Sequence, residues 1–207
     1  MRTPFDRFTA PQEEARLRSL VDRVCPSWVT PNGITYFRLA CVPVILVLMT
    51  DGGWSWTAAL VLYIAAMILD AVDGPLARAR NQVTDHGKLL DAIVDKAVVF
   101  LPFWSCWLLT GSATWSAGLL IGVGAILTII ECELLRIRLY ALVSPPPPSA
   151  VPQANGVGKA KVWVEGWMVG VALVGPREPI AHSIASALAI AAIGLAYWSL
   201  RVHHRTR

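Results

Sequence analysis

Charged residues are scarce in this chain of 207 residues. Only 15% of the residues are Asp, Glu, Lys or Arg, whereas 55% are hydrophobic and the mean hydropathy is +0.54. A soluble globular domain typically has about 25% charged residues, so the shortage argues against a soluble fold. Together with several long apolar runs, it predicts an integral membrane protein.

The sequence also lacks a CxxC pair, an apolar stretch near the N-terminus and a large net charge. The four cysteines include no CxxC pair, so we interpret them as small apolar residues rather than as metal or redox groups. The first 29 residues contain no apolar stretch near Met1, so we expect no signal peptide. The net charge is only +4, which we assign to cytoplasmic loops, and we expect no nucleic-acid partner.

Six apolar segments are candidates for spanning helices, and all but the short fifth one have roughly the 20 residues that such a helix needs. They are 30–49, 54–73, 89–109, 115–135, 160–174 and 180–199. Before them, Leu17, Leu20, Val21 and Val24 recur at helical spacing, which is typical of a helix lying on the membrane surface or on the protein itself. We therefore expect an all-α integral membrane protein with six transmembrane helices and an N-terminal amphipathic surface helix.

Lysine and arginine are unevenly distributed between these segments. Three connections are very short: 50–53, 110–114 and 175–179. If they lie outside, Arg177 is the only one of the 18 Lys and Arg residues on that side, so the positive-inside rule places both termini in the cytoplasm. We expect a multi-pass plasma-membrane protein, with a cytoplasmic segment over 1–29 and one membrane domain over 30–207.

The stretch SPPPPSAVPQANGVG, residues 144–158, has four consecutive prolines. Proline lacks a backbone donor, and a run of prolines favours polyproline II over a helix. We therefore expect a stiff, non-helical cytoplasmic linker before the fifth span.

Four aspartates stand where the second and third expected spans meet the cytoplasm. Asp70 and Asp73 are three residues apart, and Asp91 and Asp95 are four apart. On a helix, each spacing places both carboxylates on one face. Gly74-Pro75 predicts that the second helix ends there, so the third returns antiparallel to it. The four carboxylates are then expected to face one another.

Such a cluster needs positive charge nearby. An aspartate at the centre of a spanning helix costs about 2.5–3.5 kcal/mol, and one nearer the interface costs less. Arg78, Arg80, Lys88 and Lys96 are near in sequence, and carboxylate oxygens also suit Mg²⁺, Mn²⁺ or Ca²⁺. Magnesium commonly shares its coordination positions with phosphates, which points to a phosphorylated substrate. The alternative is a set of solvated helix ends with structural ion pairs.

The same residues match a known pattern. The spacing Asp70-x2-Asp73-Gly74-x2-Ala77-Arg78-x8-Gly87-x3-Asp91-x3-Asp95 resembles the motif of the CDP-alcohol phosphatidyltransferase family at all eight fixed positions. The resemblance implies six spans preceded by a surface helix, and a homodimer in the membrane lipids. It also implies transfer of a phosphatidyl or similar group from a CDP-linked donor to an alcohol, with release of CMP.

The resemblance implies a role for each motif residue. The metal ligands, for one or two Mg²⁺ or Mn²⁺ ions, would be Asp70, Asp73, Asp91 and Asp95. The residues at the CDP donor would be Asp70, Asp73, Gly74, Ala77, Arg78 and Gly87. Asp95 would also be the general base, and Arg78 would contact the pyrophosphate. These roles suit the residue types, because a carboxylate can accept a proton, arginine binds phosphate and glycine admits a ligand close to the backbone. Asp85 and His86 lie outside the fixed positions, and we interpret them as solvated loop residues.

Residues near the first, fourth and fifth spans give indications of which alcohol accepts the phosphatidyl group. TPNGITYFRL, residues 30–39, is similar to the start of the first span in the phosphatidylglycerophosphate synthase and cardiolipin synthase branch, through Pro31, Asn32, Thr35 and Arg38. A phosphorylated acceptor would need its own cations. The candidates at inner helix ends are Arg136, Arg138, Lys159 and Lys161. They can equally be ordinary positive-inside charges, or pair with the nearby glutamates Glu131, Glu133 and Glu165.

The predicted reaction is phosphatidyl transfer from CDP-diacylglycerol to a polar alcohol, with glycerol 3-phosphate as the first choice. Phosphatidylinositol phosphate synthase and cardiolipin synthase are the alternatives within the family. From another class, the acids can form the path of a divalent-cation transporter. No acidic residues lie deep in the spans to continue such a path, which disfavours it.

Overall fold

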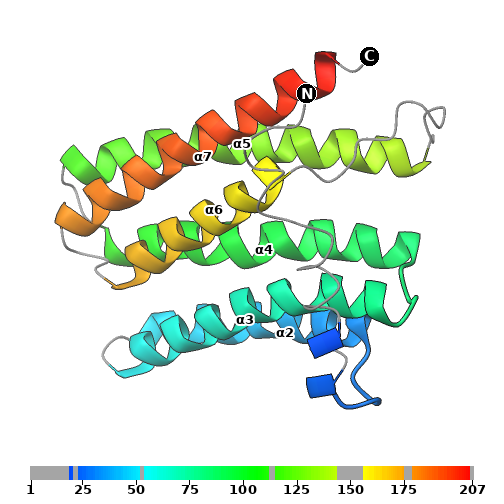
Figure 1. Cartoon of the computed structure of the whole chain (residues 1–207). Helices are drawn as coiled ribbons and strands as arrows, with labels where there is room; N and C mark the ends of the chain where they lie inside the picture. Colours follow the sequence, from blue (N-terminus) through cyan, green and yellow to red (C-terminus); the bar gives the residue numbers. More distant parts are fainter. Residues whose placement is uncertain are drawn as a thin grey trace. The chain divides into compact units, whose positions relative to one another are not determined.

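The computed structural model describes residues 19–20, 23–51, 54–111, 115–143, 156–174 and 179–205. Every regular element in this part of the chain is an α-helix (Figure 1). The long helices are α2 (Pro31–Asp51), α3 (Trp54–Ala79), α4 (Asp85–Thr110), α5 (Trp115–Val143), α6 (Gly156–Val174) and α7 (Pro179–Arg205). The predicted all-α class is confirmed.

Five of these helices are long and apolar enough to cross a membrane. The candidate spans are Pro31–Thr50, Trp54–Ala79, Asp85–Leu109, Ser116–Ile137 and Pro179–Trp198. The fifth expected span, 160–174, corresponds to α6, which is helical but carries Lys159, Lys161 and Glu165 within 19 residues and is not among the five. Large apolar side chains such as Leu108 and Ile129 are exposed on the spans, as expected for helices that face lipid.

The chain divides into two compact units, and the division falls inside α4, after Pro102. In the first unit α2 packs against α3, and α3 ends and α4 begins at the end where α2 begins (Figure 1). In the second unit α7 packs against α5 and α6. The packed face of α7 carries small, fully buried residues at helical spacing, namely Ala185, Ala189, Ala192 and Ala196. Small residues let helix backbones approach closely, which drives packing in a membrane.

The predicted end of the second span at Gly74-Pro75 is wrong. Helix α3 continues through Pro75 to Ala79, and α2 and α4 also contain internal prolines. A spanning helix tolerates proline because neighbouring helices, hydroxyl side chains and small local adjustments of the helix can satisfy the backbone groups that proline frees. The helix ends instead at Ala79, and in the turn that follows Asn81 adopts a left-handed φ of 52°, while the Gln82 amide donates to the Ala77 carbonyl at 2.9 Å. Asparagine is one of the few residues that adopt this capping conformation readily.

Threonines begin α2 and α4 in the same way. The Thr30 hydroxyl accepts a hydrogen bond from the Gly33 amide at 3.1 Å, and Thr84 accepts one from the Gly87 amide at 3.0 Å. These are N-caps, which satisfy amides that have no partner inside the helix. Both helix starts that frame the aspartate cluster are therefore fixed by local hydrogen bonds.

Arg80 fixes the segment before α2 to the end of α3. Its guanidinium donates to the backbone carbonyls of Val29 at 2.5 Å, Cys25 at 2.8 Å and Pro26 at 3.3 Å. Carbonyls that precede a helix need donors, and a charged donor forms the stronger hydrogen bonds. Arg80 therefore helps to hold the start of α2 beside the aspartates.

Two predictions fall largely outside the described residues. The predicted amphipathic helix before residue 29 includes Leu17 and Val21, which are not described. The proline-rich linker lies outside them over 144–155. Its last three residues, 156–158, belong to α6 and are helical, so the linker was predicted too long at that end.

Candidate active site

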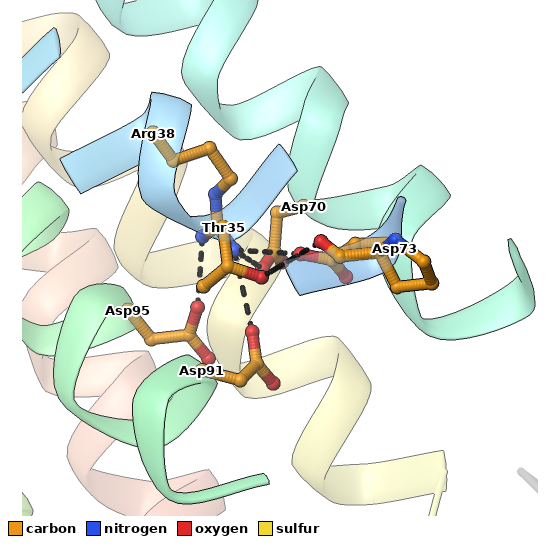
Figure 2. Close-up of polar contacts among 7 residues, drawn as sticks. Thr35, Arg38, Asp70, Asp73, Asp91 and Asp95 are labelled. Carbon is orange, nitrogen blue, oxygen red and sulfur yellow. Dashed lines mark hydrogen bonds and ion pairs between the residues drawn. The ribbon is translucent and has the colours of Figure 1, made fainter. Parts of the chain in front are cut away.

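The four motif aspartates meet around one arginine of α2. The Nη1 atom of Arg38 lies 2.7 Å from Asp70, 3.1 Å from Asp73 and 3.3 Å from Asp91, and its Nη2 atom lies 2.8 Å from Asp95. Figure 2 shows the two pairs of carboxylates pointing toward the guanidinium from α3 and α4. The prediction that both pairs face one another is thus confirmed.

Arg38 is the residue that sequence reasoning missed at this site. It was noted for its place in TPNGITYFRL but was not proposed as the partner of the aspartates. Its side chain is 1% exposed, and it lies within the apolar span of α2. A charged residue in such a span needs a buried partner, so its position alone was a usable signal.

Burial differs among the four carboxylates. The side chain of Asp73 is 8% exposed, and its carboxylate also lies 3.4 Å from the Thr35 hydroxyl. Asp91 is the most open, with 44% of its side chain exposed. The cluster therefore has a closed side at Asp73 and an open side at Asp91. A buried arginine and a buried aspartate argue against the alternative of merely solvated helix ends.

The donor set suits a hard divalent cation. One oxygen each from Asp70, Asp91 and Asp95 lies within 4.8 Å of the other two. Mg²⁺ and Mn²⁺ prefer oxygen ligands, and carboxylates are among the most suitable of them. Arg38 contributes one positive charge to a cluster of four carboxylates, so the cluster can accommodate an additional cation.

Two motif glycines have different surroundings. A Cβ atom on Gly74 would come within 4 Å only of the Arg78 guanidinium, at 3.9 Å, which is ordinary contact. A Cβ on Gly87 would lie 2.7 Å from the Asn32 side-chain oxygen and 3.0 Å from the Thr84 hydroxyl. The space at position 87 is therefore tight, and a larger residue there must displace the Asn32 or Thr84 side chain, whereas position 74 has space beside the exposed Arg78.

This contrast gives a prediction. Gly74→Ala should leave the thermal midpoint unchanged or raise it, because alanine in a helix interior is favoured over glycine by about 0.5–1 kcal/mol. It should weaken binding of a CDP-linked lipid, since the methyl group fills the space beside Arg78. Gly87→Ala should lower stability by about 1–3 kcal/mol through overpacking against the N-cap. Thermal unfolding and nucleotide-lipid binding in detergent measure both effects, and a destabilised Gly74→Ala would contradict the assignment.

Asp85 and His86 were interpreted as solvated loop residues. Both are exposed, but they form the first turn of α4 rather than a loop. Asp85 pairs with Lys88 at 2.8 Å, and the His86 Nε2 atom lies 3.2 Å from the Tyr36 hydroxyl. Acidic residues favour the first turn of a helix, which accounts for the placement of Asp85.

The predicted acceptor cations lie in the second unit, and two of their side chains are described. Lys161 is buried and lies 2.5 Å from buried Glu131 and 3.9 Å from buried Glu165. Arg136 is exposed and pairs with exposed Glu133 at 2.9 Å. The alternative that these cations pair with nearby glutamates is confirmed for both. The side chains of Arg138 and Lys159 lie outside the described residues.

Comparison with known proteins identifies the family. The model of the family described as "CDP-alcohol phosphatidyltransferase" matches residues 28–198. The chain belongs to the CDP-alcohol phosphatidyltransferase family. The match covers the aspartate cluster together with α2 and Arg38, so the geometry above is that of a phosphatidyltransferase family member.

Three relatives illustrate the range of similarity. The chain is 38% identical over 77 residues to a CDP-diacylglycerol–glycerol-3-phosphate 3-phosphatidyltransferase of Cereibacter sphaeroides, covering 36% of this chain and 35% of that protein. It is 27% identical over 166 residues to a probable phosphatidylglycerophosphate synthase of Mycobacterium tuberculosis, covering 78% and 73%. It is 28% identical over 184 residues to a CMP-forming cardiolipin synthase of Oryza sativa subsp. japonica, covering 84% and 56%. In the stronger matches, the similarity spans only about a third to two fifths of the relative's length.

Proposed function

We propose that this protein transfers a phosphatidyl group from CDP-diacylglycerol to a polar alcohol and releases CMP. The convergence of Asp70, Asp73, Asp91 and Asp95 on one buried position carries the proposal. Phosphoryl transfer depends mainly on positioning and on neutralising the charge of the phosphates. A compact carboxylate cluster at the end of two spans would supply the cation site that such a reaction needs.

Each motif residue has a proposed task. Asp70, Asp91 and Asp95 would hold one or two Mg²⁺ or Mn²⁺ ions, with Asp73 completing the set of ligands. When bound, the metal neutralises the pyrophosphate and stabilises the departing CMP. Arg78, exposed beside the open surface of Gly74, would contact the pyrophosphate. Arginine suits this task because its guanidinium can form two parallel hydrogen bonds to a phosphate.

Asp95 is proposed as the general base. Its carboxylate would accept the proton of the acceptor hydroxyl as that oxygen bonds to the phosphorus carrying the diacylglycerol. The bond from this phosphorus to the CMP oxygen breaks, and CMP leaves with the electron pair. Asp95 is 19% exposed in its side chain, so it is partly shielded from water but still accessible.

Glycerol 3-phosphate is the proposed acceptor, which would make the product phosphatidylglycerophosphate. The names of several relatives and the resemblance of residues 30–39 support this choice. Exposed Arg136 remains a proposed ligand of the acceptor phosphate, with Arg138 and Lys159. Lys161 is a weaker candidate, because its ammonium group is engaged by buried Glu131. We further propose a homodimer in the plasma membrane, with both termini and the aspartate cluster on the cytoplasmic side.

Transfer of a labelled acceptor into lipid tests this choice. The purified protein, in detergent with CDP-diacylglycerol and Mg²⁺, would receive labelled glycerol 3-phosphate, inositol 1-phosphate, serine or phosphatidylglycerol in separate reactions. We expect label from glycerol 3-phosphate to enter a phosphorylated lipid and to stay aqueous in Asp70→Asn. Incorporation of inositol 1-phosphate, or a cardiolipin product from phosphatidylglycerol, would overturn the acceptor but keep the reaction class.

A further inference from the structure

Arg38 occupies the place where a cation would bind. Its two terminal nitrogens lie between 2.7 and 3.3 Å from all four motif carboxylates. Three of these contacts fall on Nη1 alone, which carries only two hydrogens. The four carboxylates are therefore gathered around a single centre of positive charge.

The burial of Arg38 strengthens the interaction of its charge with the four carboxylates. Its side chain is 1% exposed, so water screens the guanidinium poorly. Its Nε atom has no hydrogen-bond partner among the described residues, so the arginine is held through its two terminal nitrogens. Four carboxylates without this charge would repel one another across the α3–α4 junction. A poorly hydrated cluster of like charges needs such compensation.

We propose that Arg38 is a built-in substitute cation, which holds the metal ligands together when no divalent ion is bound and competes with that ion for the same oxygens. Arg38 would then be a positioning residue, acting through the four aspartates. The inference rests on the metal site of the proposed function. It adds that the positive charge of Arg38 makes the affinity of the four carboxylates for the metal lower than it would be without this arginine.

Neutral substitutions of Arg38 make this testable without an activity assay. Arg38→Met and Arg38→Gln remove the charge with different side-chain shapes, and Arg38→Lys keeps it. Mn²⁺ binding to the purified proteins in detergent, without nucleotide, is followed by the electron paramagnetic resonance signal of free Mn²⁺. Thermal unfolding is measured for each protein in Mn²⁺ and in EDTA.

Both neutral variants should bind Mn²⁺ at least about tenfold more tightly than the wild type, because a unit charge a few ångströms from the ion is removed. They should lose more thermal stability in EDTA than the wild type does, and Mn²⁺ should restore it. Arg38→Lys should stay close to the wild type in both measurements. A role in packing alone would not tighten metal binding.

Several outcomes would overturn the proposal. Unchanged or weaker Mn²⁺ affinity in both neutral variants would do so, as would their failure to fold even in Mn²⁺. A wild type that binds no Mn²⁺ would remove this proposal together with the metal part of the proposed function. A wild type that binds Mn²⁺, with neutral variants that bind it more tightly, would support the inference even if no acceptor yielded a lipid product.

Discussion

Asp95→Asn should reduce the rate of CMP release by about 10²–10⁴-fold, the usual contribution of a general base. Asparagine has almost the same shape as aspartate and can still accept a hydrogen bond from Arg38, which lies 2.8 Å away. It cannot take a proton from the acceptor hydroxyl. The comparison should be made at saturating Mg²⁺, so that weaker metal binding does not limit the rate.

Asp85→Asn is the matched control for this substitution. It makes the same chemical change on the same helix, but Asp85 is 83% exposed and pairs with Lys88 outside the cluster. We expect nearly wild-type CMP release from this variant, because exposed ion pairs contribute little. Equal losses in the two variants, or an Asp95→Asn protein with substantial activity, would exclude Asp95 as the base.

Lys161→Met should destabilise the second unit by about 3–5 kcal/mol, since it leaves buried carboxylates without their lysine. The Lys161 ammonium lies 2.5 Å from Glu131, and both side chains are at most 4% exposed. Adding Glu131→Gln in the same protein should recover much of the loss, because the double variant removes both charges of the closest pair. Thermal or denaturant unfolding in detergent gives the comparison.

Arg136→Met is the control on the exposed pair of the same unit. Arg136 lies 2.9 Å from Glu133, but the two side chains are 77% and 57% exposed, so the pair should contribute about 0–1 kcal/mol. A Lys161→Met protein as stable as Arg136→Met would show that the buried pair is not structural. Lys161 would then return as a candidate ligand of the acceptor phosphate.

The aspartate cluster could be predicted from sequence because its information is local. Spacings of three and four residues fix which helix face Asp70, Asp73, Asp91 and Asp95 occupy, and a short connection brings the two faces together. Arg38 comes from a different helix, 32 residues before the first of these aspartates. Its pairing depends on how α2 packs against its neighbours, which no local spacing encodes.

The errors in helix boundaries have a related cause. Gly74-Pro75 is a stop signal in water, where freed backbone groups can bind solvent. Inside a membrane the remaining backbone groups keep the helix, so α3 ends only where Asn81 provides a left-handed turn. The charged residues of α6 are evident in the sequence. That Lys161 is buried against Glu131 could not be predicted, because it depends on contacts between helices.

Release of CMP from CDP-diacylglycerol tests the central claim most directly. The purified protein is incubated with the donor and glycerol 3-phosphate, in Mg²⁺ and in EDTA, and free CMP is quantified. We predict release in Mg²⁺ that disappears in EDTA and in Asp95→Asn. Release that persists in EDTA would contradict the metal site. A folded protein that neither binds CDP-diacylglycerol nor releases CMP with any acceptor would contradict the assignment of the aspartate cluster as an active site.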